Sequence, residues 1–286
     1  MGALQEKPIP LSVRIELCRA GLQVRADGLG IRMLHIKGST VDPSIRPDVR
    51  EGSDVDVIVD PGRVAELHAQ LLDGGWQVYS TFDEGSPFGH AQTYWHPDWG
   101  YVDLHRRFPG IRLDDAAAFD VLWRSHAMSS AAGRAIVVPG VGVQRALFLL
   151  NAARGTRQER EAARDQCERM PTEQHRELDA LLAELEAEVA ASVVTGELEQ
   201  WRHRPDYRLW HVISAGGTRT QEWWGRVRAA RSASEALGVV LRAPRVNRSR
   251  LRHELGRTPT GWDVFTAAVT RSRIALRDLL SGGRPG

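Results

Sequence analysis

The segment Asp54-Val-Asp-Val-Ile-Val59 limits the fold more than any other part of this chain. It begins by alternating carboxylates with valine and then becomes wholly apolar. A run of this kind is typical of a strand that enters a buried sheet. Because unpaired charges are not buried, the Asp54 end must lie at the rim of that sheet. Strand geometry then puts Asp54 and Asp56 on one face, about 6.5 to 7 Å apart along the backbone.

Strand and helix patterns alternate around this segment. Short runs of β-branched and aromatic residues predict strands over residues 31–36, 76–79, 91–95 and 101–105. Apolar residues three and four positions apart predict helices over 10–29 and 64–72, each followed or ended by glycine. The alternation over residues 1–138 therefore predicts an α/β (α+β) domain.

The rest of the chain has a helical pattern. We place a domain boundary at Pro139-Gly-Val-Gly142, after which apolar residues gather at helical spacing within 146–150 and 178–189. Further helices are expected around 220–230, 232–241 and 262–280. The prediction is thus two domains, residues 1–138 and residues 139–286.

Composition narrows the class of protein and its compartment. With 42% apolar and 26% charged residues, the 286-residue chain is globular and neither disordered nor collagenous. Cys18 and Cys167 are too few for a disulfide framework, so we expect two reduced, buried thiols. No apolar run approaches the ~20 residues that cross a bilayer, and the first residues lack a secretory signal. We therefore expect a cytoplasmic protein with no membrane association.

Charge is distributed unevenly along the chain. The net charge is +2, but residues 201–286 hold 17 Arg against 6 Asp and Glu. This basic region, with tryptophans among the arginines, could bind a nucleic acid. However, the whole chain has 36 Arg and 2 Lys, which indicates a general preference for arginine. We therefore favour a solvated basic surface over a nucleic-acid partner.

Three features on the predicted strands indicate chemistry on phosphates. Asp54 and Asp56 can converge on a pair of Mg²⁺ ions, which bind the attacking and leaving oxygens of a phosphoryl displacement and take carboxylate ligands. Asp103 supplies a third carboxylate from a later strand. Gly38 leaves room for a phosphate, and Ser39 can donate to one. Each feature alone is ordinary, but their order on successive strands favours a site for a nucleotide and metal.

Three further side chains are secondary candidates. Lys37 and Arg50 can neutralise triphosphate charge, the first as a point charge and the second through its planar fork. Alternatively, Lys37 only ends a strand and Arg50 is one of many solvated arginines. His105 shares a strand face with Asp103 and is expected to orient that carboxylate or act as a base, with the hydrogen-bonding role favoured.

These motifs resemble the nucleotidyltransferase superfamily that includes DNA polymerase beta and the aminoglycoside nucleotidyltransferases. The chain looks most like a bacterial group with a strand ending in Lys-Gly, an arginine shortly before Asp-x-Asp, and a later Asp-Leu-His. The corresponding residues here are Ile36-Lys37-Gly38, Arg50 to Asp56, and Asp103-Leu104-His105. The resemblance covers roughly residues 31–108. It implies a DNA polymerase beta-like domain with a mixed sheet, followed by a helical domain on the acceptor side.

The resemblance also implies roles for these residues. Asp54 and Asp56 would bind two Mg²⁺ ions, Asp103 would ligate the catalytic one, and Gly38 and Ser39 would hold the β and γ phosphates. The implied reaction transfers NMP from an NTP, with ATP expected, to a hydroxyl of a small molecule or natural product and releases pyrophosphate. Two alternatives stay open: nucleotidylation of a protein or peptide, and a non-catalytic protein that binds a nucleotide or RNA.

Overall fold

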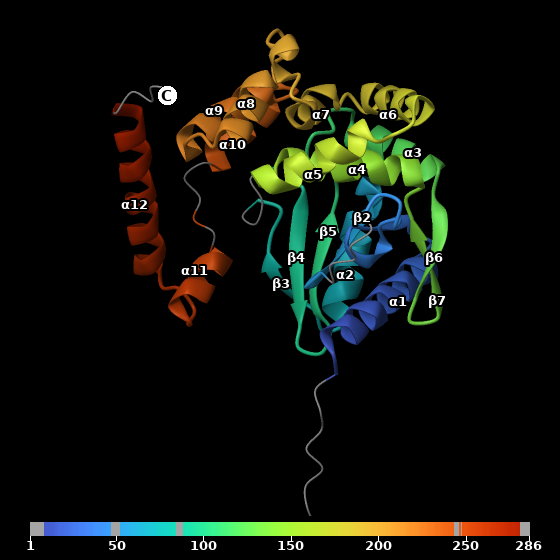
Figure 1. The fold of residues 1–286 in the computed structure, drawn as a ribbon. Coiled ribbons are helices and arrows are strands. Elements are labelled where there is room, and N and C mark those ends of the chain that lie inside the picture. The colour runs from blue at the N-terminus through green and yellow to red at the C-terminus, as the bar shows by residue number, and fades with distance from the viewer. Residues whose placement is uncertain (1–8, 47–51, 84–87, 243–245, 247, 281–286) are drawn as a thin grey trace, which may run out of the picture. The chain divides into compact units, whose positions relative to one another are not determined.

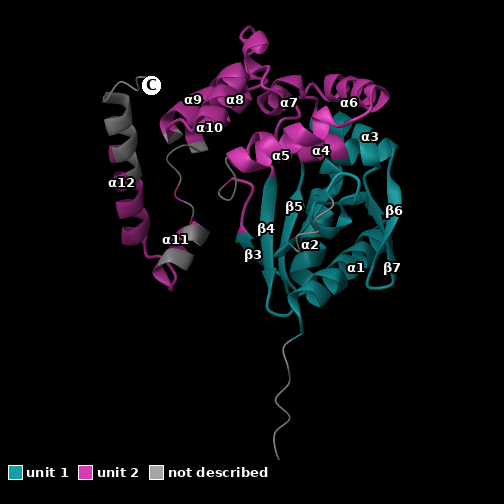
Figure 2. Cartoon of the chain, in the orientation of Figure 1, with its two compact units in different colours: residues 1–79, 91–107, 115–144 teal, residues 80–90, 108–114, 145–286 magenta. Residues whose placement is uncertain are grey.

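The computed structural model describes residues 9–46, 52–83, 88–242, 246 and 248–280 (Figure 1). The chain forms two compact units, shown in Figure 2. Unit 1 contains Met1–Tyr79, Ala91–Arg107 and Asp115–Gln144; unit 2 contains Ser80–His90, Phe108–Asp114 and Arg145–Gly286. Two short segments from the first half of the chain therefore belong to the unit that holds the second half.

Unit 1 is built on a five-stranded mixed sheet, which confirms the predicted α/β class. The strands are β1 (Met33–Ile36), β2 (Asp54–Val59), β3 (Gln77–Ser80), β4 (Ala91–His96) and β5 (Gly100–His105), in the order β1-β2-β5-β4-β3. Strand β2 pairs with β1 antiparallel and with β5 in parallel, and β4 pairs with β5 antiparallel. The apolar run of β2 thus lies between two neighbours, where buried strands are expected.

Helices and a hairpin complete unit 1: α1 (Leu11–Leu29), α2 (Val64–Asp73), α3 (Asp115–Arg124), β6 (Ala127–Ala131) and β7 (Arg134–Val138). Helix α1 presents Ile15, Cys18, Leu22 and Ala26 to the core at helical spacing. It ends at Gly30, whose φ of 61° suits the left-handed position after a helix. Strand β7 contacts α1 and β1, and the Val137 N–H donates to Gln23 Oε1 at 3.1 Å.

Helix α3 and the β6–β7 hairpin are absent from the elements predicted from the sequence. The first four residues of β6 are exposed, so that strand carries no apolar alternation that could have marked it. The expected strands near 31, 76, 91 and 101 are present, and their bounds differ from the expected ones by up to two residues.

Unit 2 is helical, as expected for the second half of the chain. Beginning with α4, whose first residues belong to unit 1, the helices are α4 (Val141–Ala153), α5 (Arg157–Glu168), α6 (Thr172–Glu184), α7 (Glu188–Thr195), α8 (Tyr207–Ala215), α9 (Arg219–Ala229), α10 (Ala233–Arg242), α11 (Arg248–Leu255) and α12 (Gly261–Leu280). The apolar patch over 178–189 spans a break between α6 and α7, where Glu186 has a φ of 50°.

Both cysteines are free and buried, as predicted. Burial raises the pKa of the Cys18 thiol to about 12 and also raises that of Cys167. Among the described helices, none is both long enough and apolar enough to cross a bilayer.

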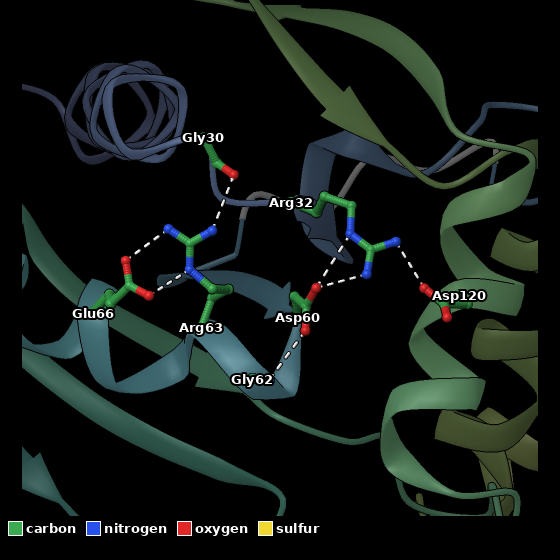
Figure 3. Close-up of polar contacts among 7 residues, drawn as sticks. All are labelled: Gly30, Arg32, Asp60, Gly62, Arg63, Glu66 and Asp120. Carbon is green, nitrogen blue, oxygen red and sulfur yellow. Dashed lines mark hydrogen bonds and ion pairs between the residues drawn. The ribbon is translucent and has the colours of Figure 1, made fainter.

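A polar network joins the start of β1 to the end of β2 and to α3 (Figure 3). Arg32 donates to Asp60 Oδ2 from Nε at 3.2 Å and from Nη2 at 2.6 Å, and to Asp120 Oδ1 from Nη1 at 2.7 Å. Its guanidinium carbon lies 5.1 Å from the centre of the Phe119 ring. Nearby, Arg63 donates to the Gly30 carbonyl at 3.5 Å. The Arg32 guanidinium therefore links the start of β1 to the end of β2 and to α3.

We expect Arg32→Met to lower the free energy of unfolding by about 1 kcal/mol, because methionine keeps the apolar stem but removes three hydrogen bonds. The Arg32 side chain is 40% exposed, so solvent screens the charges and limits the loss. Urea denaturation measures it. Arg157→Met is the control, since Arg157 is 87% exposed and its ion pair with Glu161 lies within α5. Equal losses in both variants would contradict the prediction.

Candidate functional site

The predicted carboxylates lie on two adjacent strands of unit 1. In the parallel β2–β5 pair, Asp54 is in register with Tyr101 and Asp56 with Asp103. Residues in register share a face of the sheet, so all three carboxylates project from the same side. One ligand atom each from Asp56, Asp103 and His105 lies within 4.8 Å of the others. Asp54 is at the start of β2 and is not part of this group.

Asp56 is the most enclosed of the three acids. Its Oδ1 lies 2.5 Å from Lys37 Nζ and accepts a hydrogen bond from His105 Nε2 at 2.8 Å. Burial alone would raise the pKa of this carboxyl, but the Lys37 charge and the His105 hydrogen bond together lower it to about 2. Asp56 is therefore a fixed negative charge inside the site.

The pKa values of the other two acids, Asp54 and Asp103, are raised rather than lowered. Burial, reinforced by the charges of Asp56 and Asp54, raises the pKa of Asp103 to about 6, although Thr93 Oγ1 donates to its Oδ1 at 2.6 Å. Burial and the Asp56 charge also raise the pKa of Asp54. Three carboxyl groups thus lie near a single lysine charge and repel one another when ionised. A divalent cation would relieve this repulsion. Carboxylate oxygens and an imidazole nitrogen are suitable ligands for such an ion.

The Lys37-Gly38-Ser39 turn leaves β1 beside these acids. Lys37 has φ 62° and ψ −175°, a region that residues other than glycine rarely occupy. Gly38 has a φ of 57°, and a Cβ there would lie 2.7 Å from an Arg19 nitrogen. Only glycine fits this position without displacing the Arg19 side chain.

Arg19 and Glu16 on α1 are two functional candidates that were not predicted from the sequence. Arg19 is 2% exposed and donates from Nη1 to Ser39 Oγ at 2.5 Å and to Glu16 Oε1 at 2.8 Å. The Ser39 hydroxyl in turn donates to Glu16 at 3.1 Å. Arg19 therefore holds the Lys37-Gly38-Ser39 turn through the Ser39 hydroxyl. A signal was present, because Arg19 lies within the apolar stripe between Ile15 and Leu22, where a charged residue needs a partner.

The remaining predicted residues have different outcomes. His105 Nε2 lies 2.8 Å from Asp56 Oδ1, so the imidazole helps to orient the Asp56 carboxylate. Thr93 on β4, which the sequence analysis did not single out, is the residue that donates to Asp103. Arg50 lies outside the described residues.

Comparison with known proteins gives matches among solved structures only. No protein-family model and no curated protein matches the sequence. The antibiotic-resistance factor ANT(2'')-Ia is 15% identical, with a TM-score of 0.40 over 66% of this chain and 95% of that one. The lincosamide antibiotic adenylyltransferase LnuA, solved with lincomycin bound, is 17% identical, with a TM-score of 0.33 over 58% of this chain and 94% of that one.

A nucleotidyltransferase-like protein from Paracoccidioides brasiliensis is 15% identical, with a TM-score of 0.38 over 66% of this chain and all of that one. At such low similarity, the functional assignment rests on the geometry of the site itself.

Proposed function

We propose that unit 1 is the catalytic part of a metal-dependent nucleotidyltransferase that transfers NMP from an NTP, with ATP expected, to a hydroxyl of a small molecule. One observation carries the proposal: Asp54, Asp56 and Asp103 share one face of adjacent strands, beside the Gly38-Ser39 turn. Carboxylates that adjoin a glycine-serine turn are what a nucleotide with its divalent ions requires.

Each residue has a defined task in this reaction. Asp54, Asp56 and Asp103 would hold divalent cations, with His105 hydrogen-bonded to Asp56, and such ions, when bound, neutralise charge on the phosphates. The Gly38 turn would receive the β and γ phosphates, and Lys37, beside that turn, would add positive charge. Asp103, whose pKa is raised to about 6, would take the proton of the attacking hydroxyl. A new bond forms from that oxygen to the α-phosphorus, the bond to the β-phosphate oxygen breaks, and pyrophosphate leaves.

The test is a transfer assay on the full chain. We incubate it with each α-labelled NTP, Mg²⁺ and a panel of hydroxyl-bearing natural products, and measure pyrophosphate release and the destination of the label. Label on a small molecule is the expected result. Label on protein would favour protein nucleotidylation instead. Absence of transfer, together with polynucleotide binding that weakens steeply with salt, would favour a binding protein. A role for residues 139–286 on the acceptor side stays a prediction.

A further inference from the structure

Three aromatic side chains lie beside the carboxylates of unit 1. Tyr101 on β5 is in register with Asp54, and Trp95 on β4 is in register with Tyr101. The Tyr79 ring, from β3, lies 5.3 Å from the Tyr101 ring at an angle of 78°. All three side chains are half-buried. We call Tyr79, Trp95 and Tyr101 the aromatic row.

The aromatic row shares a face with the acids. Tyr101 precedes Asp103 by two residues on β5, and side chains two apart on a strand point the same way. Trp95 follows Thr93 by two residues on β4, and the Thr93 hydroxyl donates to Asp103. The row is therefore a continuation of the candidate active site and not part of the opposite face of the sheet.

Trp95 stands out within the row. Within the described part of the chain, its indole takes part in no hydrogen bond and no ring contact, whereas Tyr101 contacts Tyr79. A half-exposed indole presents a flat apolar surface with a polar N–H at its edge, which suits a ring-shaped ligand better than an aliphatic one. Rings that stack on such a surface can gain roughly tenfold in affinity.

The order of the strands indicates which ligand the row meets. Across the sheet β1-β2-β5-β4-β3, the Gly38-Ser39 turn follows β1, the acids lie on β2 and β5, and the aromatic row extends over β5, β4 and β3. In an in-line displacement, the attacking oxygen and the leaving oxygen lie on opposite sides of the phosphorus. With the leaving phosphates at the turn, the attacking hydroxyl must approach from the side of β4.

We propose that the aromatic row is the acceptor subsite and binds a flat ring next to the hydroxyl that is modified. This inference rests on the proposed function, because it takes the direction of the phosphates from it. It assigns a chemical class to the acceptor: a hydroxyl-bearing compound with an aromatic or otherwise flat, apolar ring face. The nucleobase of the NTP is the other possible source of such a ring, and the experiment separates the two.

The experiment measures binding rather than turnover, so it does not depend on transfer activity. Phenyl β-D-glucopyranoside, adenosine and a non-hydrolysable ATP analogue are titrated into the full chain by calorimetry, for wild type, Trp95→Leu and Trp95→Phe. We expect Trp95→Leu to weaken binding of the phenyl glucoside about tenfold and Trp95→Phe to restore most of it. The ATP analogue should bind all three proteins alike. Trp262→Leu, at an indole that is 71% exposed on α12, is the control and should change nothing.

Two results would overturn the inference. If wild type does not bind the phenyl glucoside, or binds it independently of Trp95, the row is no ring subsite. If only adenosine and the ATP analogue lose affinity in Trp95→Leu, the row holds the nucleobase instead. Failure of the proposed function is recognised separately, by wild type that binds no ATP analogue and releases no pyrophosphate.

Discussion

Asp56→Asn is expected to lower the rate of nucleotidyl transfer about a thousandfold or more while the protein stays folded. The Asp56 carboxylate carries a full negative charge, since its pKa is lowered to about 2. Asparagine has nearly the same volume and still accepts a hydrogen bond from His105, but it cannot supply the charge that balances a divalent cation. The substitution therefore weakens the binding of the metal ions and the phosphates and leaves the packing of the protein unchanged.

The measurement pairs the initial rate of pyrophosphate release with urea denaturation of the same preparations. Asp98→Asn is the matched control, because the Asp98 side chain lies in the same unit and is 78% exposed. It should retain the wild-type rate. A rate for Asp56→Asn within about tenfold of wild type, far short of the loss expected when transition-state charge is left unbalanced, would remove Asp56 from the mechanism.

Local patterns in the sequence predicted the part of the site that one or two strands define. The alternation in Asp54–Val59 places two carboxylates at the rim of a buried strand, and the same argument puts Asp103 and His105 on one face of β5. These conclusions need only the geometry of a single strand. The parallel register that sets Asp56 opposite Asp103 required the folded sheet, because no property of either strand alone fixes its neighbour.

The residues that were missed come from elements distant in sequence. Arg19 reaches the turn from α1, and Thr93 reaches Asp103 from β4, so both contacts depend on how helices and strands pack together. The ion pair between Lys37 and Asp56 belongs to the same class, since β1 and β2 must pair before the lysine meets the acid. Sequence spacing therefore predicted the acids of the candidate site, with Lys37 and His105, but not their mutual contacts or the supporting residues Arg19 and Thr93.

A second prediction with a large effect concerns His35, which lies on β1 and is completely buried. Among the residues that the structure describes, neither of its ring nitrogens finds a hydrogen-bond partner. Its neighbour Ile36 is in register with Asp56, so His35 points to the opposite face of the sheet from the candidate site. Burial, together with repulsion from Arg19, lowers the pKa of His35 to about 3. The histidine is therefore held neutral in the native state.

This buried neutral histidine makes the protein sensitive to acid. In the unfolded chain, histidine has a pKa of about 6.5 and takes up a proton as the pH falls below that value, whereas the native state does not. The contribution of His35 to stability is therefore fully present above pH ~6.5 and is lost as the pH falls from about 6.5 towards 3. Between pH 7 and pH 5 the histidine contributes a loss of about 2 kcal/mol in the free energy of unfolding.

His35→Leu removes the titrating group and keeps a similar volume, so it should abolish this share of the acid sensitivity. It should also stabilise the protein at pH 7, because an unpaired polar ring is replaced by an apolar side chain. Urea denaturation of both proteins at pH 7 and pH 5 measures the difference. His126→Leu, at an exposed histidine of the same unit, should keep the wild-type pH dependence. The prediction is contradicted if His35→Leu loses as much stability between pH 7 and pH 5 as wild type does. In that case the pKa of His35 is nearly the same in the native and the unfolded state, and the histidine takes up its proton without unfolding the protein.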